Sequence, residues 1–384
     1  MFGTFIKMHC RRRAEQLTES VAENYSAVRV KICVTGICGF VGSTLARTLR
    51  EHFPDWTING IDNLSRPGSE LNRSSLQTLG IGVMHGDLRN ASDLEPLPDI
   101  DWIIDAAANP SVLAGVDGKN GSRQVIENNL YGTVNLLEHC RRRKCGFILL
   151  STSRVYSIEA LSSLRLCVRD RAFDLSGEGL PMSVSPNGVD ESFPTTAPLS
   201  LYGSTKLASE NLALEYYHAF GVPVWINRCG VLAGAGQFGR IDQGIFSFWI
   251  NSYLQKRRLC YTGFGGKGYQ VRDCLHPRDL VGLIARQMQT SNSSQSYCVN
   301  VSGGQSNSMS LAQLSEWCGA RFRRRHRITS ESASHRFDVP WLILDSRRAA
   351  KQWNWRVETP ISSILEEIAA HAEAHPEWLQ LSGS

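Results

Sequence analysis

The sequence predicts an α/β protein: a doubly wound parallel sheet with a smaller, interleaved C-terminal α/β lobe. Short β-branched apolar runs alternate with segments of helical apolar spacing from residue 29 to residue 150, as in sheets with right-handed crossovers. Glycines 36, 39 and 42 separate the first such run from the first such helix. Domains contain ~150 residues on average, so the length of 384 residues predicts two lobes.

Each element is placed by its apolar pattern. Residues 30–34 have the composition of a buried parallel strand, and Leu45, Ala46 and Leu49 follow at helical spacing. Further strands are expected at 57–61, 81–84, 102–104, 146–150 and 222–227, and further helices at 125–142, 202–220 and 361–374. The turn-rich stretch 158–198 is expected to be a long functional loop.

These elements divide the chain into three parts. Residues 1–27 form a tail to which we assign no function, residues 28–226 a dinucleotide-binding domain, and residues 227–384 a second lobe, some of whose strands return to the first sheet.

Composition and charge exclude several classes of protein. The formal net charge is only +5, from 41 basic and 36 acidic residues, which argues against a nucleic-acid binder. No apolar stretch approaches the ~18 residues of a membrane span. The eleven cysteines include no C-x-x-C pair, so no zinc site is predicted, and buried reduced thiols of a cytoplasmic enzyme are favoured over a disulfide scaffold.

The run Thr35–Gly42 is a G-x-x-G-x-x-G sequence between a strand and a helix. Side chains at its glycines would keep the backbone from a pyrophosphate, and the helix that follows offers free N–H groups to phosphates. Asp62 ends the second strand 20 residues past the last glycine, where it can bind ribose hydroxyls and repel a 2′-phosphate. The pattern predicts a Rossmann site for NAD rather than NADP. The expected contacts are Gly36, Gly39, Phe40, Val41, Gly42 and Asp62.

A candidate reaction centre follows. Thr152 comes directly after an apolar strand, and Tyr202 and Lys206 lie one helical turn apart on the same face. A lysine ammonium beside a phenol stabilises the phenolate and should lower the tyrosine pKa from ~10. Tyr202 could then take a proton from a substrate alcohol while hydride leaves for the nicotinamide, with Thr152 hydrogen-bonded to the same oxygen.

With these residues the chain resembles the extended short-chain dehydrogenase/reductases from about residue 28 to about residue 355. The matching stretches are the glycine run, residues 62–65, residues 85–89, Asn129, the Tyr202/Lys206 pair and residues 270–273. The resemblance implies a C-terminal lobe that holds a nucleotide sugar. It also implies further cofactor contacts from Asn63, Asp87, Leu88, Ala106, Ala107, Asn129, Tyr202 and Lys206.

The residues after Thr152 discriminate within the family. At this point sugar dehydratases of the family have Thr-Asp-Glu, and sugar-acid decarboxylases have Thr-Ser-Glu. This chain has Thr152-Ser153-Arg154 instead. No acid is therefore placed to protonate a departing hydroxyl. The chain is most similar to the CDP-paratose 2-epimerase (tyvelose epimerase) group, which has Ser-Thr-Asn-Lys-Val-Tyr at residues 151–156. Further matches lie at 186–191, 237–238, 242–244, 268–276 and 303–308.

This resemblance implies bound NAD, a CDP-sugar substrate, and a homodimer formed through helices 125–142 and 201–220. The candidate substrate contacts are Ser153, Arg154, Gln237, Asp242, Arg272 and Arg336. Arg272 suits the diphosphate, because a planar fork matches phosphate oxygens, but a structural pair with Asp273 is the alternative. The chain departs from the group at residues 229–231 and 334–336 and in its longer 158–198 stretch.

The predicted reaction is inversion of C2 through a transient ketone, re-reduced by the same bound cofactor. A paratose-like sugar lacks a 3-hydroxyl, so oxidation at C4 would not acidify the proton at C2, and direct oxidation at C2 is the simpler route. Three alternatives stay open: a nucleotide-sugar 4-epimerase, a net NAD(P)-dependent reductase or decarboxylase on the same fold, and a non-catalytic NAD-binding module.

Overall fold

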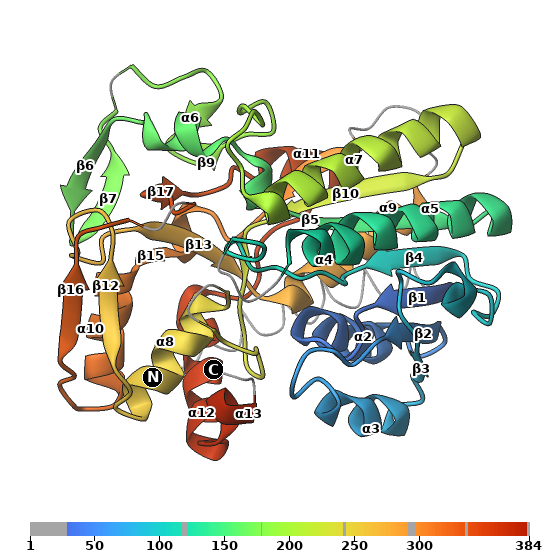
Figure 1. Ribbon diagram of the computed structural model, residues 1–384, viewed down its shortest axis with the longest axis horizontal. Helices are drawn as coiled ribbons and strands as arrows, with labels where there is room; N and C mark the ends of the chain where they lie inside the picture. Colours follow the sequence, from blue (N-terminus) through green and yellow to red (C-terminus); the bar gives the residue numbers. More distant parts are fainter. Residues whose placement is uncertain are drawn as a thin grey trace, which may run out of the picture.

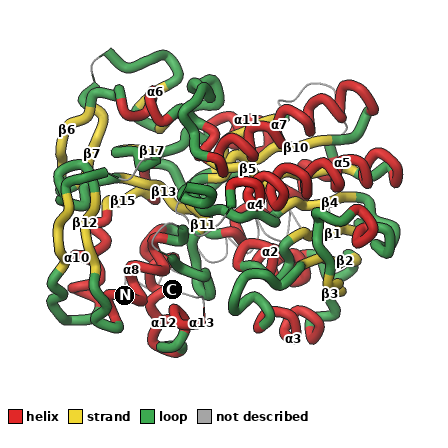
Figure 2. The backbone as a smooth tube through the Cα atoms, in the orientation of Figure 1, coloured by secondary structure: helices red, strands yellow, loops and turns green. Residues whose placement is uncertain are grey.

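The computed structural model describes residues 29–116, 121–177, 179–240, 243–290, 297–334 and 337–381. The proposed tail, residues 1–27, lies outside this set. Within the described residues, a central sheet has seven strands in the order β14-β10-β5-β4-β1-β2-β3 (Figures 1 and 2). Every neighbouring pair in it is parallel. The strands are β1 (Lys31–Thr35), β2 (Thr57–Asp62), β3 (Gly82–His85), β4 (Trp102–Asp105), β5 (Gly146–Thr152), β10 (Val224–Cys229) and β14 (Cys298–Val301). The predicted α/β fold is confirmed.

Helices cover both faces of this sheet, because alternate residues of its strands enter two separate cores. On β1, Ile32 and Val34 pack into one core and Cys33 into the other. The first core is closed by α2 (Phe40–His52), α3 (Leu71–Thr78), α9 (Val281–Gln289) and α11 (Arg347–Trp353). The second is closed by α5 (Gly132–Arg143) and α7 (Leu201–Phe220).

The helix expected at 125–142 is interrupted. It consists of α4 (Ser122–Ile126), a π-helical turn at Glu127–Tyr131, and α5. The extra residue of a π turn leaves no clear mark in an apolar repeat, so the sequence pattern does not reveal it. Such turns concentrate at functional sites, and this one carries Asn129, a predicted cofactor contact, which is buried.

A second group of elements lies beside the central sheet, on the left in Figure 1. Its strands are β11 (Val231–Leu232), β12 (Leu259–Thr262), β13 (Val271–Leu275), β15 (Ser308–Ser310), β16 (Ile328–Glu331) and β17 (Trp341–Leu342). Its helices are α8 (Ile245–Leu254), α10 (Leu311–Arg321), α12 (Ile361–Ala374) and α13 (Trp378–Leu381). Strand β13 pairs with β11, β15 and β17. Between β13 and β15 the chain returns to the central sheet as β14, so the two groups alternate along the sequence.

The stretch 158–198, expected to be a loop without regular structure, contains a helix and two hairpins, so that expectation is wrong. It contains α6 (Ile158–Ser162), the hairpin β6 (Leu166–Arg169) with β7 (Ala172–Leu175), and the hairpin β8 (Val184–Ser185) with β9 (Gly188–Val189). Asp170 and Arg171 turn the first hairpin with positive φ angles of 44° and 62°. Two-residue turns of this kind usually carry Asn-Gly or Asp-Gly, so the Asp-Arg pair does not predict a hairpin. Leu161, Leu175 and Val184 pack against Trp341 in a core of their own.

The ten described cysteines are free thiols, and seven of them are buried. No helix among the described residues is both long and apolar enough to traverse a bilayer. The same ranges hold no group of three or more His, Cys, Asp or Glu side chains that could bind a metal ion.

Candidate active site

The glycine run forms a cradle that only glycine permits. Gly36 has a φ of +60°, and a Cβ there would lie 2.9 Å from the Cα of Ala107. A Cβ at Gly42 would lie 2.2 Å from the carbonyl oxygen of Gly36. Gly39 is the N-cap of α2, so the free N–H groups of the first helical turn open onto this loop. The close backbone approach and the helix end fit a dinucleotide pyrophosphate.

Asp62, at the end of β2, is tied to the same loop. Its carboxylate accepts hydrogen bonds from the backbone N–H of Cys38 at 2.9 Å and of Leu64 at 2.8 Å. Burial raises the Asp62 pKa, and these backbone hydrogen bonds act against that rise. Phe40 is buried in the first turn of α2 against Phe238, and Val41 packs on the same cluster. The predicted ribose carboxylate and the phosphate loop are thus one hydrogen-bonded unit.

The residues predicted near the adenine lie along the next strand end. Asn63 donates to Asp87 at 3.3 Å. Asp87 also pairs with Arg89 at 2.6 Å, and chiefly this hydrogen-bonded partner lowers the Asp87 pKa to about 2. The carbonyl oxygen of Leu88 accepts a hydrogen bond from Asn135 on α5 at 2.7 Å. Strand ends β2 and β3 are therefore linked to each other and to the helix layer.

The end of β4 completes the predicted cofactor side. The backbone N–H groups of Ala106 and Ala107 both donate to the Thr35 hydroxyl, each at 3.1 Å. Asn129 accepts from the Asn109 backbone N–H at 2.8 Å and donates to the Thr205 hydroxyl at 3.2 Å. Asn129 therefore connects the β4 loop to α7, the helix that carries Tyr202.

The predicted reaction centre is brought together where β5 ends and α7 begins. Thr152 is the last residue of β5, and its side chain lies close enough to the Tyr202 phenol to act on the pKa of that group. Tyr202 and Lys206 are both buried on α7, which starts after the Ser200 N-cap. Burial raises the pKa of the nearby Cys229 thiol of β10 to about 12, and the charge of Lys206 acts against that rise.

The electrostatics differ from the sequence expectation. Burial raises the Tyr202 pKa to about 12, instead of the lowering expected from Lys206. Two groups act in the opposite direction, the hydrogen bond from Thr152 and the charge of Arg154. Desolvation of the phenolate therefore outweighs its local support, and Arg154 is a cation that provides part of that support.

Arg272 pairs with Asp338 and not with Asp273, the acid named as the alternative to a diphosphate contact. Its guanidinium donates to Asp338 at 2.7 Å and to the Val339 carbonyl at 2.7 Å, whereas the neighbouring Asp273 accepts from the Leu344 backbone N–H. Asp338 was missed because it lies 66 residues away in the sequence, in a stretch without a recognisable motif.

The other predicted substrate contacts are Ser153, Gln237, Asp242 and Arg336, and the structure describes the first two of them. Ser153 is buried in the short 3₁₀ turn after Thr152. Gln237 donates its side-chain N–H to the Leu232 carbonyl at 2.7 Å, and its backbone carbonyl accepts from Trp378. Asp242 and Arg336 lie outside the described residues.

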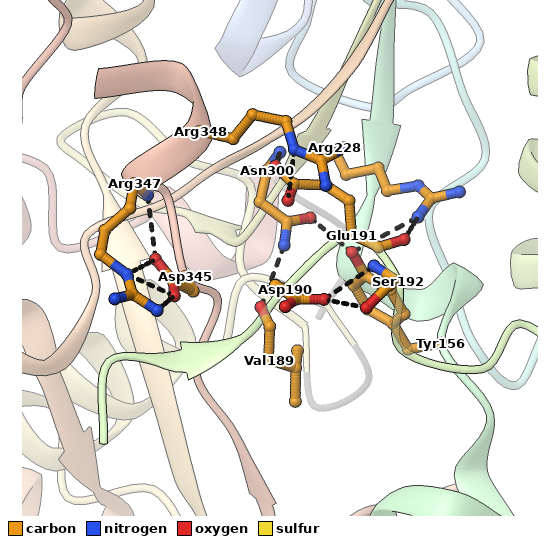
Figure 3. Close-up of polar contacts among 10 residues, drawn as sticks. All are labelled: Tyr156, Val189, Asp190, Glu191, Ser192, Arg228, Asn300, Asp345, Arg347 and Arg348. Carbon is orange, nitrogen blue, oxygen red and sulfur yellow. Dashed lines mark hydrogen bonds and ion pairs between the residues drawn. The ribbon is translucent and has the colours of Figure 1, made fainter. Parts of the chain in front are cut away.

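A buried polar network, which the sequence did not predict, links β10, β14 and the segment around Glu191; Figure 3 shows its residues Tyr156, Glu191, Arg228 and Asn300. Arg228 of β10 binds Glu210 of α7 at 2.7 Å and contacts Tyr156. Tyr156 donates to Asn300 of β14 at 2.6 Å, and the Asn300 backbone N–H donates to Glu191 at 2.8 Å. An arginine within an apolar strand signals a buried partner, but sequence alone does not identify the acid.

Comparison with known proteins agrees with this geometry. The profile of the NAD dependent epimerase/dehydratase family matches residues 32–301. The CDP-paratose 2-epimerase of Salmonella typhi is 29% identical over 85% of this chain and 94% of its own length. UDP-glucuronate 4-epimerase 1 of Arabidopsis thaliana is 28% identical over 65% of this chain and 53% of its own length.

A solved structure shows the same fold. The UDP-glucuronic acid 4-epimerase of Bacillus cereus, in complex with UDP-glucuronic acid and NAD, superimposes with a TM-score of 0.71 at 24% identity. The match covers 90% of this chain and 99% of the other.

Proposed function

Since this chain belongs to the NAD-dependent epimerase/dehydratase family and is an NAD-dependent epimerase of the extended short-chain dehydrogenase/reductase type, we propose that it inverts C2 of a CDP-paratose-like nucleotide sugar. The observation that carries the proposal is that Thr152 and the charge of Arg154 both lie close enough to the buried Tyr202 phenol to act on its pKa, with the Arg154 backbone N–H hydrogen-bonded to the Thr152 hydroxyl. This arrangement supplies proton-transfer groups without a carboxylic acid at positions 153 or 154 to expel a hydroxyl. The likeness to the Salmonella typhi enzyme over most of both chains supports the same reaction.

The cradle of Gly36 and Gly42 and the Asp62 carboxylate suit NAD, which supplies a hydride acceptor and donor when bound. Tyr202 takes the proton of the C2 hydroxyl, and Thr152 hydrogen-bonds the same oxygen in the alcohol and in the ketone. Once the ketone has presented its other face, Tyr202 returns the proton to the oxygen. No net oxidation takes place, so no external reductant is consumed.

The test of this proposal is Tyr202→Phe, which removes the phenolic proton donor and acceptor and keeps the ring. We expect turnover of CDP-paratose to fall by roughly 10²- to 10⁴-fold, the typical contribution of general acid–base catalysis. Circular dichroism should show an unchanged fold. A Tyr202→Phe enzyme of wild-type activity contradicts the assignment.

Isotopes identify the carbon. We expect deuterium placed at C2 of the sugar to slow turnover and to stay in the product, because hydride leaves and returns within one site. A 4-epimerase, the alternative that the UDP-glucuronate relatives suggest, shows the effect with deuterium at C4. A net reductase shows a steady change in nicotinamide absorbance, and a decarboxylase releases carbon dioxide. A binding module leaves the redox state of its NAD unchanged with every nucleotide sugar.

We also propose a homodimer formed through α5 and α7. Two large apolar side chains at the ends of this helix layer support the proposal, Tyr131 with 59% and Phe220 with 55% of their surface exposed. Light scattering of the wild type and of Phe220→Glu tests it, since a charge within the interface should shift the mass toward the monomer.

A further inference from the structure

Two arginines approach the substrate side of the centre, and their hydrogen-bonding differs. A guanidinium carries five N–H donors. Arg272 uses its two terminal nitrogens on three acceptors, namely Asp338 and the carbonyls of Val271 and Val339, all within 2.8 Å. Among the described residues the Arg154 side chain makes one long hydrogen bond, to the Phe337 carbonyl at 3.4 Å. Within the described part of the chain, Arg154 therefore keeps donors of the kind that Arg272 has already used.

The environment of Arg154 favours an anion. Burial, with repulsion from Arg272, lowers the Arg154 pKa to about 10, and Asp338 and Tyr202 act in the opposite direction. Asp338 is already hydrogen-bonded to Arg272. Arg154 is half-buried, and partly withdrawing a cation from water is unfavourable unless a partner compensates its lost hydration. An anionic group of a ligand would provide that compensation.

The backbone fixes Arg154 between the two reactive hydroxyls. Its N–H donates to the Thr152 hydroxyl at 3.1 Å. Its carbonyl oxygen packs on Gly203, the residue after Tyr202, so closely that a Cβ there would lie 2.3 Å away. At the other end its guanidinium reaches Phe337, whose neighbour Asp338 holds Arg272. Arg154 thus spans from the centre to the predicted diphosphate arginine.

We propose that Arg154 binds the sugar-side phosphate of the nucleotide sugar and thereby places the C2 hydroxyl at Tyr202. C2 is bonded to the anomeric carbon, which carries the phosphate oxygen, whereas C4 lies across the ring. A cation close to both the phosphate and the proton-transfer group therefore selects C2. This inference rests on the proposed function and makes Arg154 its specificity-determining residue.

Binding of nucleotides tests it without turnover. Calorimetry gives the affinities of the NAD-loaded protein for CMP and CDP and for UMP and UDP, and the base that binds more tightly is used. In the wild type the second phosphate should raise affinity. In Arg154→Met the ratio of diphosphate to monophosphate affinity should fall by ~10- to 100-fold, as for loss of a charge-assisted hydrogen bond. The affinity for the monophosphate should stay constant. Arg154→Lys should retain part of the gain.

The control is Arg143→Met, which removes an exposed arginine at the far end of α5 and should leave both affinities unchanged. Thermal unfolding of each variant shows that it is folded, and Arg154→Gln replaces Arg154→Met if the latter is not. An undiminished gain from the second phosphate in the folded variants overturns the inference. If Arg154→Met loses the gain but the isotope effect appears at C4, the phosphate contact stands and the C2 selection fails with the proposed function. If the wild type binds none of these nucleotides, both are overturned.

Discussion

The cofactor side and the substrate side of the site are built differently. On the cofactor side, contacts join loops that directly follow neighbouring parallel strands, such as Asp62 to Cys38 and Ala106 to Thr35. On the substrate side, side chains from distant parts of the chain meet, such as Arg154 with Phe337 across 183 residues. The geometry of the cofactor side is therefore set by the order of the parallel strands. The geometry of the substrate side is set by tertiary packing between segments far apart in the sequence.

The two sides should also differ in their response to substitutions and to pH. The cofactor side is shaped by backbone approaching backbone, so an added carbon atom is enough to disturb it. The substrate side is shaped by buried charges, so its response should depend on pH. Substitutions that act on one side alone therefore test whether the two are independent.

The largest effect is expected from Gly42→Ala. Its Cβ would lie 2.2 Å from the Gly36 carbonyl oxygen, a contact that only a shift of backbone can relieve. We expect the free energy of unfolding to fall by ~1–3 kcal/mol, and the purified protein to contain less NAD. Affinity for CDP should be kept. Mass spectrometry of released NAD, urea unfolding and calorimetry measure the three quantities.

Gly282→Ala is the matched control, since that glycine lies in α9 with open space around its Cβ position. This variant should keep its NAD and gain up to ~1 kcal/mol from helix propensity. Equal loss of NAD and CDP affinity in Gly42→Ala would show that the two sides are coupled.

The same contrast explains how much the sequence could predict. The apolar runs are local patterns, and they placed the central strands. The glycine run, Asp62 and the Tyr202/Lys206 spacing are local patterns too, and they predict the cofactor loop and the reaction centre. The partner of Arg272 was not predictable, because Asp338 arrives through tertiary packing. The 158–198 stretch was misjudged for a local reason, since its first hairpin turns at Asp170 and Arg171 without a glycine.

A second prediction concerns Asp273, which is buried beside Arg272. Burial raises its pKa to about 6, above the ~3.9 of an unfolded aspartate. Between these values the folded state binds more protons, so the wild type should lose stability relative to Asp273→Asn as pH rises from ~4 to ~6, by up to about 1.4 kcal/mol per pH unit. Urea unfolding of both proteins across this range measures the difference, and parallel curves would contradict it.

The smallest effect is expected at Asp87 on the cofactor side, where the pH dependence has the opposite sign. Arg89 lowers the Asp87 pKa to about 2, so the pair stabilises the fold above ~pH 4 and loses this contribution as pH falls toward 2. Arg89 is 39% exposed, so solvent screens the pair.

The wild type should therefore exceed Asp87→Asn by less than ~1 kcal/mol at pH 6. Urea unfolding at pH 3 to 6 should show the gap closing toward the acid end, and 1 M salt should reduce it at pH 6. The two variants together sharpen the contrast. As pH rises, stability relative to the Asn variant should increase for Asp87 and decrease for Asp273. The Asp87 carboxylate is partly exposed and gains a cation, whereas the enclosed Asp273 carboxylate loses its water.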